Sequence, residues 1–113
     1  MDKLNKLIQT VETRKPITFT YNKPGKIQGT RIGNVHAVFI FIAKSGLKST
    51  KVHIVQTAGV SDSDCENPFP DFRMFDIGTI DNIEILESEP QFEIFKEKYN
   101  SEWHGYANTI AKV

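Results

Sequence analysis

Residues 36–43, HAVFIFIA, are apolar at both odd and even positions and include four large side chains. In an extended strand, alternate side chains face opposite sides of the sheet, so this run has two apolar faces. Such a strand is stable only inside a sheet that is covered on both sides. The run therefore predicts a central strand, and the fold of this chain has to place other residues over each of its faces.

Shorter strand-like segments surround this run. Ile17, Phe19 and Tyr21 alternate with polar residues, and Pro24-Gly25 then signals a turn. The remaining strand-like segments are IQGTRI, KVHIVQ, FRMFDI and IDNIEIL. Short strands with close turns predict a small, strongly bent antiparallel barrel over residues 17–86.

A helix is predicted before the barrel. Four apolar residues recur at the spacing of one helical face, and Pro16 ends the pattern. These four residues are Leu4, Leu7, Ile8 and Val11. Residues 1–15 are therefore expected to form an N-terminal helix.

A second helical region is predicted after the barrel. Ser88 and Gln91 form an S-x-x-Q capping pattern, with Pro90 in the first turn. Three aromatic residues at helical spacing follow, and they are Phe92, Phe95 and Tyr99. Residues 88–113 are thus expected to form a helical tail that packs its aromatic rings on the barrel or across a homodimer. The predicted fold class is mainly β with flanking helices (α+β), in a single domain of residues 1–113.

Several protein classes are excluded or disfavoured by composition. A chain of 113 residues has room for one ordinary domain, and its single cysteine, Cys65, cannot form an internal disulfide. No apolar run approaches the ~20 residues of a membrane span. We therefore expect a cytoplasmic protein with no membrane partner.

Enzyme signatures are not found either. The sequence has no glycine-rich phosphate loop and no cysteine or histidine cluster with zinc spacing. No Ser-His-Asp arrangement stands out. We expect a non-enzymatic protein without a cofactor or metal.

Charge is unevenly distributed along the chain. Residues 1–60 carry ten lysines and arginines and two acids, whereas residues 61–113 carry four and twelve. A basic half of this kind favours an anionic partner, although the two halves could also neutralise each other in the fold. The candidate basic patch consists of Lys23, Lys26, Lys44, Lys48 and Lys51.

Three segments in order resemble the WYL-domain superfamily, in particular its short single-domain members. They are TRIGNVHAV (30–38), VQTAGVS (55–61) and FPDFRMFDIGTIDNIEIL (69–86), and the resemblance covers roughly residues 14–86. The Trp-Tyr-Leu triplet of the family is absent, and Val35 stands where relatives commonly have proline. The resemblance implies an Sm-like β-barrel of bacterial or phage origin that senses nucleic acid or nucleotide ligands.

Five residues on the predicted strands are candidate ligand contacts. A guanidinium can fork onto a phosphate, a side-chain amide both donates and accepts, and a tyrosine ring can stack on a base. The candidates are Arg31, His36, Gln56, Arg73 and Tyr21, of which the first four match polar positions of the family pattern.

Each candidate also has a structural alternative. Arg73 could pair with Asp71 or Asp76, and His36 could be a hydrogen-bonded core histidine. Gln56 could satisfy backbone groups at a bulge, and the tyrosine could pack with the apolar residues that it alternates with.

The sequence therefore predicts a non-enzymatic binding and regulatory module for nucleic acid or a nucleotide-like anion. The alternative is a protein-interaction module of a phage or mobile element that docks on a host or virion protein. A homodimer is expected in either case.

Overall fold

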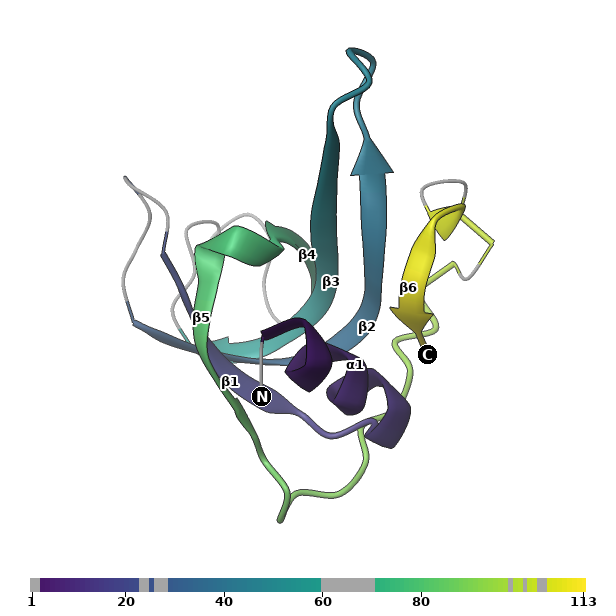
Figure 1. The fold of residues 1–113 in the computed structure, drawn as a ribbon. Coiled ribbons are helices and arrows are strands. Elements are labelled where there is room, and N and C mark those ends of the chain that lie inside the picture. The colour runs from purple at the N-terminus through teal and green to yellow at the C-terminus, as the bar shows by residue number, and fades with distance from the viewer. Residues whose placement is uncertain are drawn as a thin grey trace.

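The computed structural model describes residues 3–22, 25, 29–59, 71–97, 99–100, 102–103 and 106–113 (Figure 1). These ranges contain the helix α1 (Lys3–Thr13) and the strands β1 (Ile17–Tyr21), β2 (Thr30–Ile42), β3 (Lys48–Gly59), β4 (Asp71–Asp76), β5 (Ile80–Ile85) and β6 (Thr109–Lys112). A 3-10 turn, η1 (Ile77–Thr79), joins β4 to β5. The candidates Lys23 and Lys26, together with Cys65, lie outside the described residues, as does the side chain of Asp71.

The strands form one antiparallel sheet in the order β4-β3-β2-β1-β5. The long strand β2 pairs with β3 along one edge, while β1 and then β6 pair with its other edge. Within the described ranges no ladder joins β4 to β5, so the sheet is bent but open. The prediction of a mainly β antiparallel fold behind an N-terminal helix is confirmed, whereas a closed barrel is not seen.

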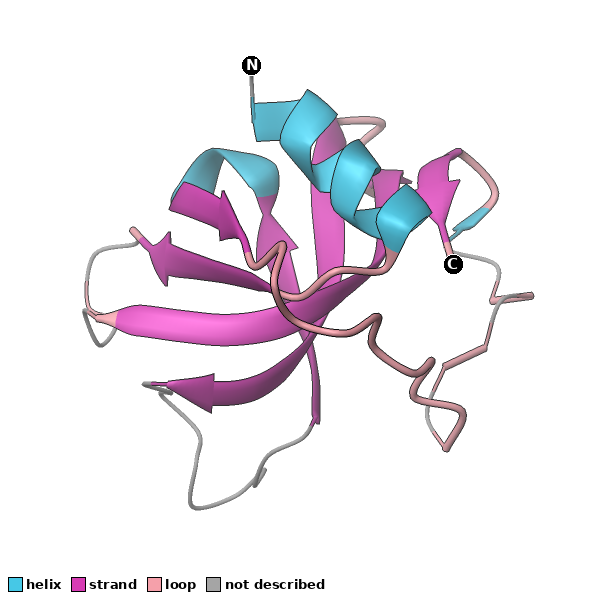
Figure 2. Cartoon of the chain, turned by 90° about the horizontal axis from the view of Figure 1, so that it is seen from below, coloured by secondary structure: helices cyan, strands magenta, loops and turns pink. Residues whose placement is uncertain are grey.

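Helix α1 lies across one face of the sheet, which we call the inner face (Figure 2). Leu7 and Val11, from the predicted apolar stripe, are buried against it. The inner-face core also contains Ile17, Phe19, Val35, Val38, Val52, Ile54, Phe75, Ile80 and Ile83. At 11 residues, α1 is too short to cross a membrane, and no other described helix qualifies.

The C-terminus of α1 is capped by a contact with the C-terminal tail, residues 88–113. Arg14 has a φ of 53°, in the left-handed region, and turns the chain out of the helix before Pro16. The carbonyl of Thr13 accepts a hydrogen bond from Gln91 Nε2 at 3.0 Å. Since the last carbonyls of a helix have no partner inside it, this contact ties the tail to α1.

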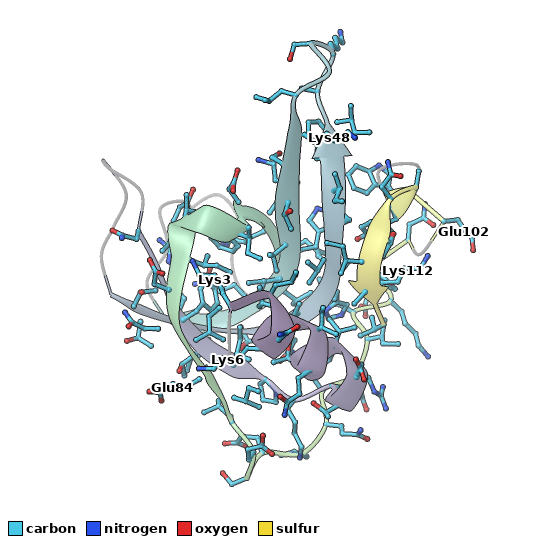
Figure 3. The ribbon with its side chains drawn as sticks, viewed as in Figure 1. Lys3, Lys6, Lys48, Glu84, Glu102 and Lys112 are labelled. Carbon is cyan, nitrogen blue, oxygen red and sulfur yellow. The ribbon has the colours of Figure 1, made fainter. Side chains whose placement is uncertain are left out.

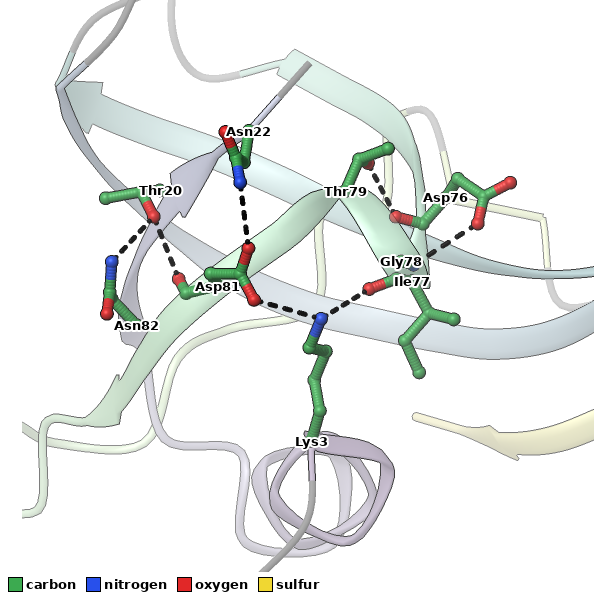
Figure 4. A network of polar contacts seen from close by, with 9 residues as sticks. All are labelled: Lys3, Thr20, Asn22, Asp76, Ile77, Gly78, Thr79, Asp81 and Asn82. Atoms are coloured by element: carbon green, nitrogen blue, oxygen red, sulfur yellow. Dashed lines mark hydrogen bonds and ion pairs between the residues drawn. The ribbon is translucent and has the colours of Figure 1, made fainter.

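A network of polar contacts fastens the other end of α1 to η1 and β5 (Figure 4). Lys3 Nζ donates to the carbonyl of Ile77 at 3.1 Å and lies 3.2 Å from Asp81 Oδ1. Asp76 Oδ1 accepts from the amide of Gly78 at 3.2 Å, which caps the 3-10 turn. Both ends of the helix are thus bonded to segments about 75 residues later in the chain.

The tail is not the helix predicted for residues 88–113. Residues 90–95 have no regular secondary structure, and β6 is a strand. Amides that a helix would bond internally are used elsewhere: the Phe92 amide donates to the Arg14 carbonyl at 2.8 Å, and the Phe95 amide to His36 Nε2 at 3.1 Å. Tertiary contacts therefore override the local capping signal of this segment.

The opposite, outer face of the sheet is covered by this irregular tail. Ala37 and Phe39 pack there against Tyr106, with Tyr99 and Trp103 around them. Stacking of the Phe92 ring on His36, with centroids 5.1 Å apart, extends the cluster. The aromatic residues of the tail thus pack on the sheet as expected, but from a non-helical backbone.

The apolar run of β2 is buried only in its first half. Val38 is fully buried and Ile40 half-buried, whereas Phe41 and Ile42 are 38% and 47% exposed. Figure 1 shows the reason, because the distal part of the β2-β3 hairpin rises beyond the other strands. We call the part of this hairpin from Ile40 to Thr50 the arm.

Val38→Asp is expected to lower the free energy of unfolding by more than about 4 kcal/mol, since it places an unpaired charge in the inner-face core. Ile42→Asp, in the exposed arm of the same strand, should cost less than about 1 kcal/mol. Chemical denaturation followed by circular dichroism measures both. Equal midpoints for the two variants would show that the burial assigned to β2 is wrong.

Candidate functional site

Two irregularities in the β2-β3 ladder set the direction of the predicted site residues. Val35 pairs with Ile54, but the next pair is Ala37 with His53, so His36 is an extra residue in β2. A β-bulge of this kind lets two neighbouring residues face the same side of the sheet. It turns the His36 ring toward the outer face.

His36 is fully buried and bonded through both ring nitrogens. Nε2 accepts the amide hydrogen of Phe95 at 3.1 Å, so Nδ1 carries the ring hydrogen and donates it to the Asn34 carbonyl at 3.0 Å. Burial lowers the pKa of His36. Its geometry is that of the hydrogen-bonded core histidine, the structural alternative given for it above.

Gln56 lies at the second irregularity. Ile32 pairs with Ala58 and Gly33 with Gln56, which leaves Thr57 as the extra residue of β3. The Gln56 side chain is fully buried, and its Nε2 donates to the Ala58 carbonyl at 3.2 Å. The side-chain amide therefore satisfies a backbone carbonyl at a bulge, as in the structural alternative given for Gln56.

Tyr21, Arg31 and Arg73 lie on the inner face. Arg31 is only 2% exposed, and its Cζ lies 5.0 Å from the centre of the Tyr21 ring and 6.0 Å from that of Phe75. Arg73 pairs with Ile54 of the inner-face core and so shares this face. The two arginines and Tyr21 are therefore on the side of the sheet opposite to His36.

The described lysines of the candidate basic patch lie far from Arg31. Lys44 lies in the turn of the arm, and Lys48 pairs with Ile42 near its end (Figure 3). Arg31 lies near the start of β2, eleven residues before Ile42 and thus about 36 Å away along the strand. Lys51 lies nearer the sheet, 3.2 Å from Asp76 Oδ2. The structure thus spreads these cations along the hairpin instead of gathering them with the arginines.

A pocket of about 320 Å³ lies instead on the outer face, and we call it the aromatic pocket. Its lining consists of His53, Phe72, Asn100, Trp103 and Tyr106. His53 stacks on Trp103 with ring centres 5.3 Å apart, and Trp103 meets Tyr106 edge-on at 5.2 Å. Strands β3 and β4 provide one wall and the tail provides the other.

The polar groups of the aromatic pocket are uncharged near neutral pH. A hydrogen bond of 2.7 Å joins His53 Nδ1 to the Tyr106 hydroxyl. Burial, with a smaller contribution from His36, lowers the pKa of His53 to about 4, and burial raises the pKa of Tyr106. The nearby cation is the exposed Lys112, whose Nζ lies 5.8 Å from the centre of the Tyr106 ring.

Sequence reasoning did not identify this pocket, because the residues of its two walls are 28 to 53 positions apart in the sequence. The available signal was the histidine inside the apolar segment KVHIVQ, together with the aromatic spacing of the tail. Flat aromatic walls suit a planar ring, and the Asn100 amide can donate to and accept from its edge. Among the residues with described positions, no group of three His, Cys, Asp or Glu side chains could hold a metal ion.

The lowered histidine pKa values predict how stability depends on pH. Unfolded His53 takes up a proton near its ordinary pKa of 6.5, whereas the folded form resists protonation until about pH 4. Stability should therefore fall as pH drops from 6.5 toward 4. His53→Phe should flatten this dependence between pH 5 and 6.5, with His36 providing what remains. Denaturation midpoints measure the effect, and an NMR pKa near 6.5 for His53 would contradict it.

Comparison with known proteins gives the chain no assignment. No protein-family model matches it, and searches of curated proteins and of solved structures also give no match. The chemistry of its own side chains is thus the basis for assigning a ligand to the aromatic pocket.

Proposed function

We propose that this chain is a non-enzymatic, WYL-like binding and regulatory module for nucleic acid or a nucleotide-like anionic ligand. The aromatic pocket carries the proposal, because its lining of four rings and one amide suits a nucleobase. Its volume of about 320 Å³ lies within the range of small-molecule sites. Stacking of a base on an aromatic side chain contributes about 1–3 kcal/mol.

Charge favours a base with phosphate over a cationic ligand. Aromatic cages also bind cations, but the exposed ammonium of Lys112 beside Tyr106 would repel one. The same ammonium attracts a phosphate attached to a stacked base. No aspartate or glutamate occurs between Glu12 and Asp62, so β2 and β3 carry positive charges only.

The architecture supports the proposal in a coarser way. A helix followed by a strongly bent antiparallel sheet is what the resemblance to WYL domains leads one to expect. In this proposal His36 supports the pocket from behind: it holds the tail through Phe95, and its ring meets Phe72 at 5.2 Å. Arg31 packs on the Tyr21 ring, and Gln56 donates to the Ala58 carbonyl. Direct ligand contact by these residues and by Tyr21 and Arg73 stays a prediction.

A second candidate function is a protein-interaction module that docks on a host or virion protein. Its support is the arm, where Leu47 is 73% exposed and Ile42 47% exposed. Contiguous apolar patches on a protein surface are typical of interaction sites, and these two side chains would form part of such a patch. The homodimer likewise stays a prediction, and sedimentation velocity at several concentrations tests it.

Trp103 provides a direct test of the first candidate because it is the only tryptophan in the chain. A base stacked in the aromatic pocket should quench its fluorescence during titration with nucleotides and short oligonucleotides. The affinity for oligonucleotides should fall log-linearly with salt, since phosphate contacts release counterions.

Trp103→Ala should weaken binding about 5- to 150-fold, the equivalent of one lost stacking contact, as measured by anisotropy of a labelled oligonucleotide. Leu47→Ala is the matched control, because it removes an exposed apolar side chain from the arm and leaves the pocket intact. If the folded wild-type protein binds no nucleotide or oligonucleotide at low salt, the proposal fails and the interaction module takes its place.

A further inference from the structure

The hydrogen bond between His53 and Tyr106 decides which polar groups of the aromatic pocket remain for a ligand. Tyr106 is only 7% exposed, and within the described part of the chain its hydroxyl bonds to Nδ1 of His53 alone. A buried hydroxyl that donates to nothing is costly, so the Tyr106 hydroxyl donates its hydrogen to this nitrogen. Because Nδ1 is then the acceptor, the His53 ring carries its own hydrogen on Nε2.

This arrangement of hydrogens holds near neutral pH. Burial raises the pKa of Tyr106, so its hydroxyl keeps the hydrogen that it donates. Burial lowers the pKa of His53 to about 4, so the ring carries one hydrogen only. The Nε2 group of the half-buried His53 ring is therefore a neutral donor, and no described residue accepts a hydrogen bond from it.

Asn100 provides a second donor to the same pocket. Its Oδ1 accepts the backbone amide hydrogen of Glu102 at 3.0 Å. A backbone N–H can only donate, so this contact fixes which end of the Asn100 side chain carries the oxygen. The contact also forms a local side-chain turn, which holds the side chain in one orientation. The group left for a ligand is therefore Nδ2, with its two hydrogens.

From these two donors we infer that the aromatic pocket selects an oxopurine, the class of guanine and hypoxanthine, over adenine. His53 Nε2 and Asn100 Nδ2 are the specificity-determining groups. The inference rests on the proposed function and names the class of base that the same pocket takes.

The edges of the bases account for this choice. Stacking on aromatic rings does not distinguish the bases, because each of them has a flat π face. Guanine presents two neighbouring acceptors, N7 and O6, whereas adenine presents N7 beside an amino group that donates. Two donors of the pocket can therefore both bond to the guanine edge, but one of them would face a donor on adenine. Cytosine presents an amino donor, and thymine has a single acceptor on the corresponding edge.

The acceptors of the aromatic pocket are less selective than its donors. The Tyr106 hydroxyl already bonds to His53, and Asn100 Oδ1 already bonds to Glu102. An oxygen with one hydrogen bond loses little when no second donor reaches it. An N–H that a ligand covers without accepting its hydrogen loses its bond to water, and this desolvation weakens binding. The two donors therefore decide which base is preferred.

The experiment measures the affinities of guanosine, inosine and adenosine monophosphate for the full chain by isothermal titration calorimetry. The inosine nucleotide keeps N7 and O6 but lacks the amino group of guanine. The guanosine and inosine nucleotides should each bind about 5- to 150-fold more tightly than the adenosine nucleotide, as expected for a pair of hydrogen bonds to a base edge.

Asn100→Asp replaces the donor by an oxygen and keeps the Oδ1 that accepts the Glu102 amide. Its added charge repels the phosphate of every nucleotide alike, so the readout is the ratio of guanosine to adenosine monophosphate affinity. This ratio should fall at least about fivefold. Asn108→Asp is the matched control, because it makes the same change at an exposed tail residue that does not line the pocket. It should leave the ratio unchanged.

Three results would each overturn the inference while the proposed function stands. They are equal affinities for the guanosine and adenosine nucleotides, an inosine nucleotide that binds as weakly as the adenosine nucleotide, and equal effects of the two Asp variants on the ratio. Absence of binding by all three nucleotides also overturns the inference. If oligonucleotides fail to bind as well, the proposed function falls with it.

Discussion

The two-sided burial of β2 is the constraint on which the rest of the structure depends. Five consecutive residues, from Val35 to Phe39, are buried and need cover on both faces of the sheet. The inner face is covered by α1, whose apolar stripe packs on Val38 and its neighbours. The outer face is covered by a segment with no regular structure, which is held by aromatic packing and a few hydrogen bonds. The inner layer is a helix and the outer layer is an irregular tail, and the candidate site lies between this tail and the sheet.

The irregular layer depends on the bulge at His36. A fully regular β2 would turn either His36 or Ala37 to the inner face, because side chains alternate along a strand. With the bulge, Nε2 of His36 accepts the amide of Phe95, which a helical tail would bond internally. The tail therefore runs extended across the aromatic rings. An irregular backbone fills the surface less uniformly than a helix, and the aromatic pocket is the space that it leaves beside the stacked rings of His53 and Trp103.

Patterns local in the sequence predicted the local parts of the fold. The stripe from Leu4 to Val11 gave the helix, and alternation around Phe19 gave an antiparallel strand with its inner face correctly assigned. The tail could not be predicted in the same way, because the capping signal at Ser88 competes with partners about 60 to 80 residues away, such as Thr13 and His36. An apolar run also does not show where the cover on the sheet ends. For this reason the sequence predicted burial for Phe41 and Ile42, although both are exposed.

The candidate residues Arg31, His36 and Gln56 illustrate a related limit. A polar side chain in an apolar strand has to find a partner, and the sequence does not say whether that partner is the protein or a ligand. Here His36 and Gln56 form hydrogen bonds to backbone carbonyls next to two β-bulges. The sequence does not show where these bulges lie. Arg31 packs on an aromatic ring. The structure therefore shows partners within the protein for these residues, and their direct contact with a ligand stays a prediction.

This arrangement gives ligand binding a consequence for the fold itself. One wall of the aromatic pocket, with His53 and Phe72, belongs to the sheet, and the other, with Trp103 and Tyr106, belongs to the tail. A ligand in the pocket would touch both walls and so would add contacts that exist only while the tail is docked. By mass action, a ligand that binds only this state stabilises it in proportion to the logarithm of its concentration above the dissociation constant. The tail also carries β6 and closes the C-terminus of α1, so a ligand on the outer face would reinforce the packing of the inner face as well. Under the proposed function, ligand binding would therefore be coupled to docking of the tail, and coupling of this kind is what a regulatory binding domain requires.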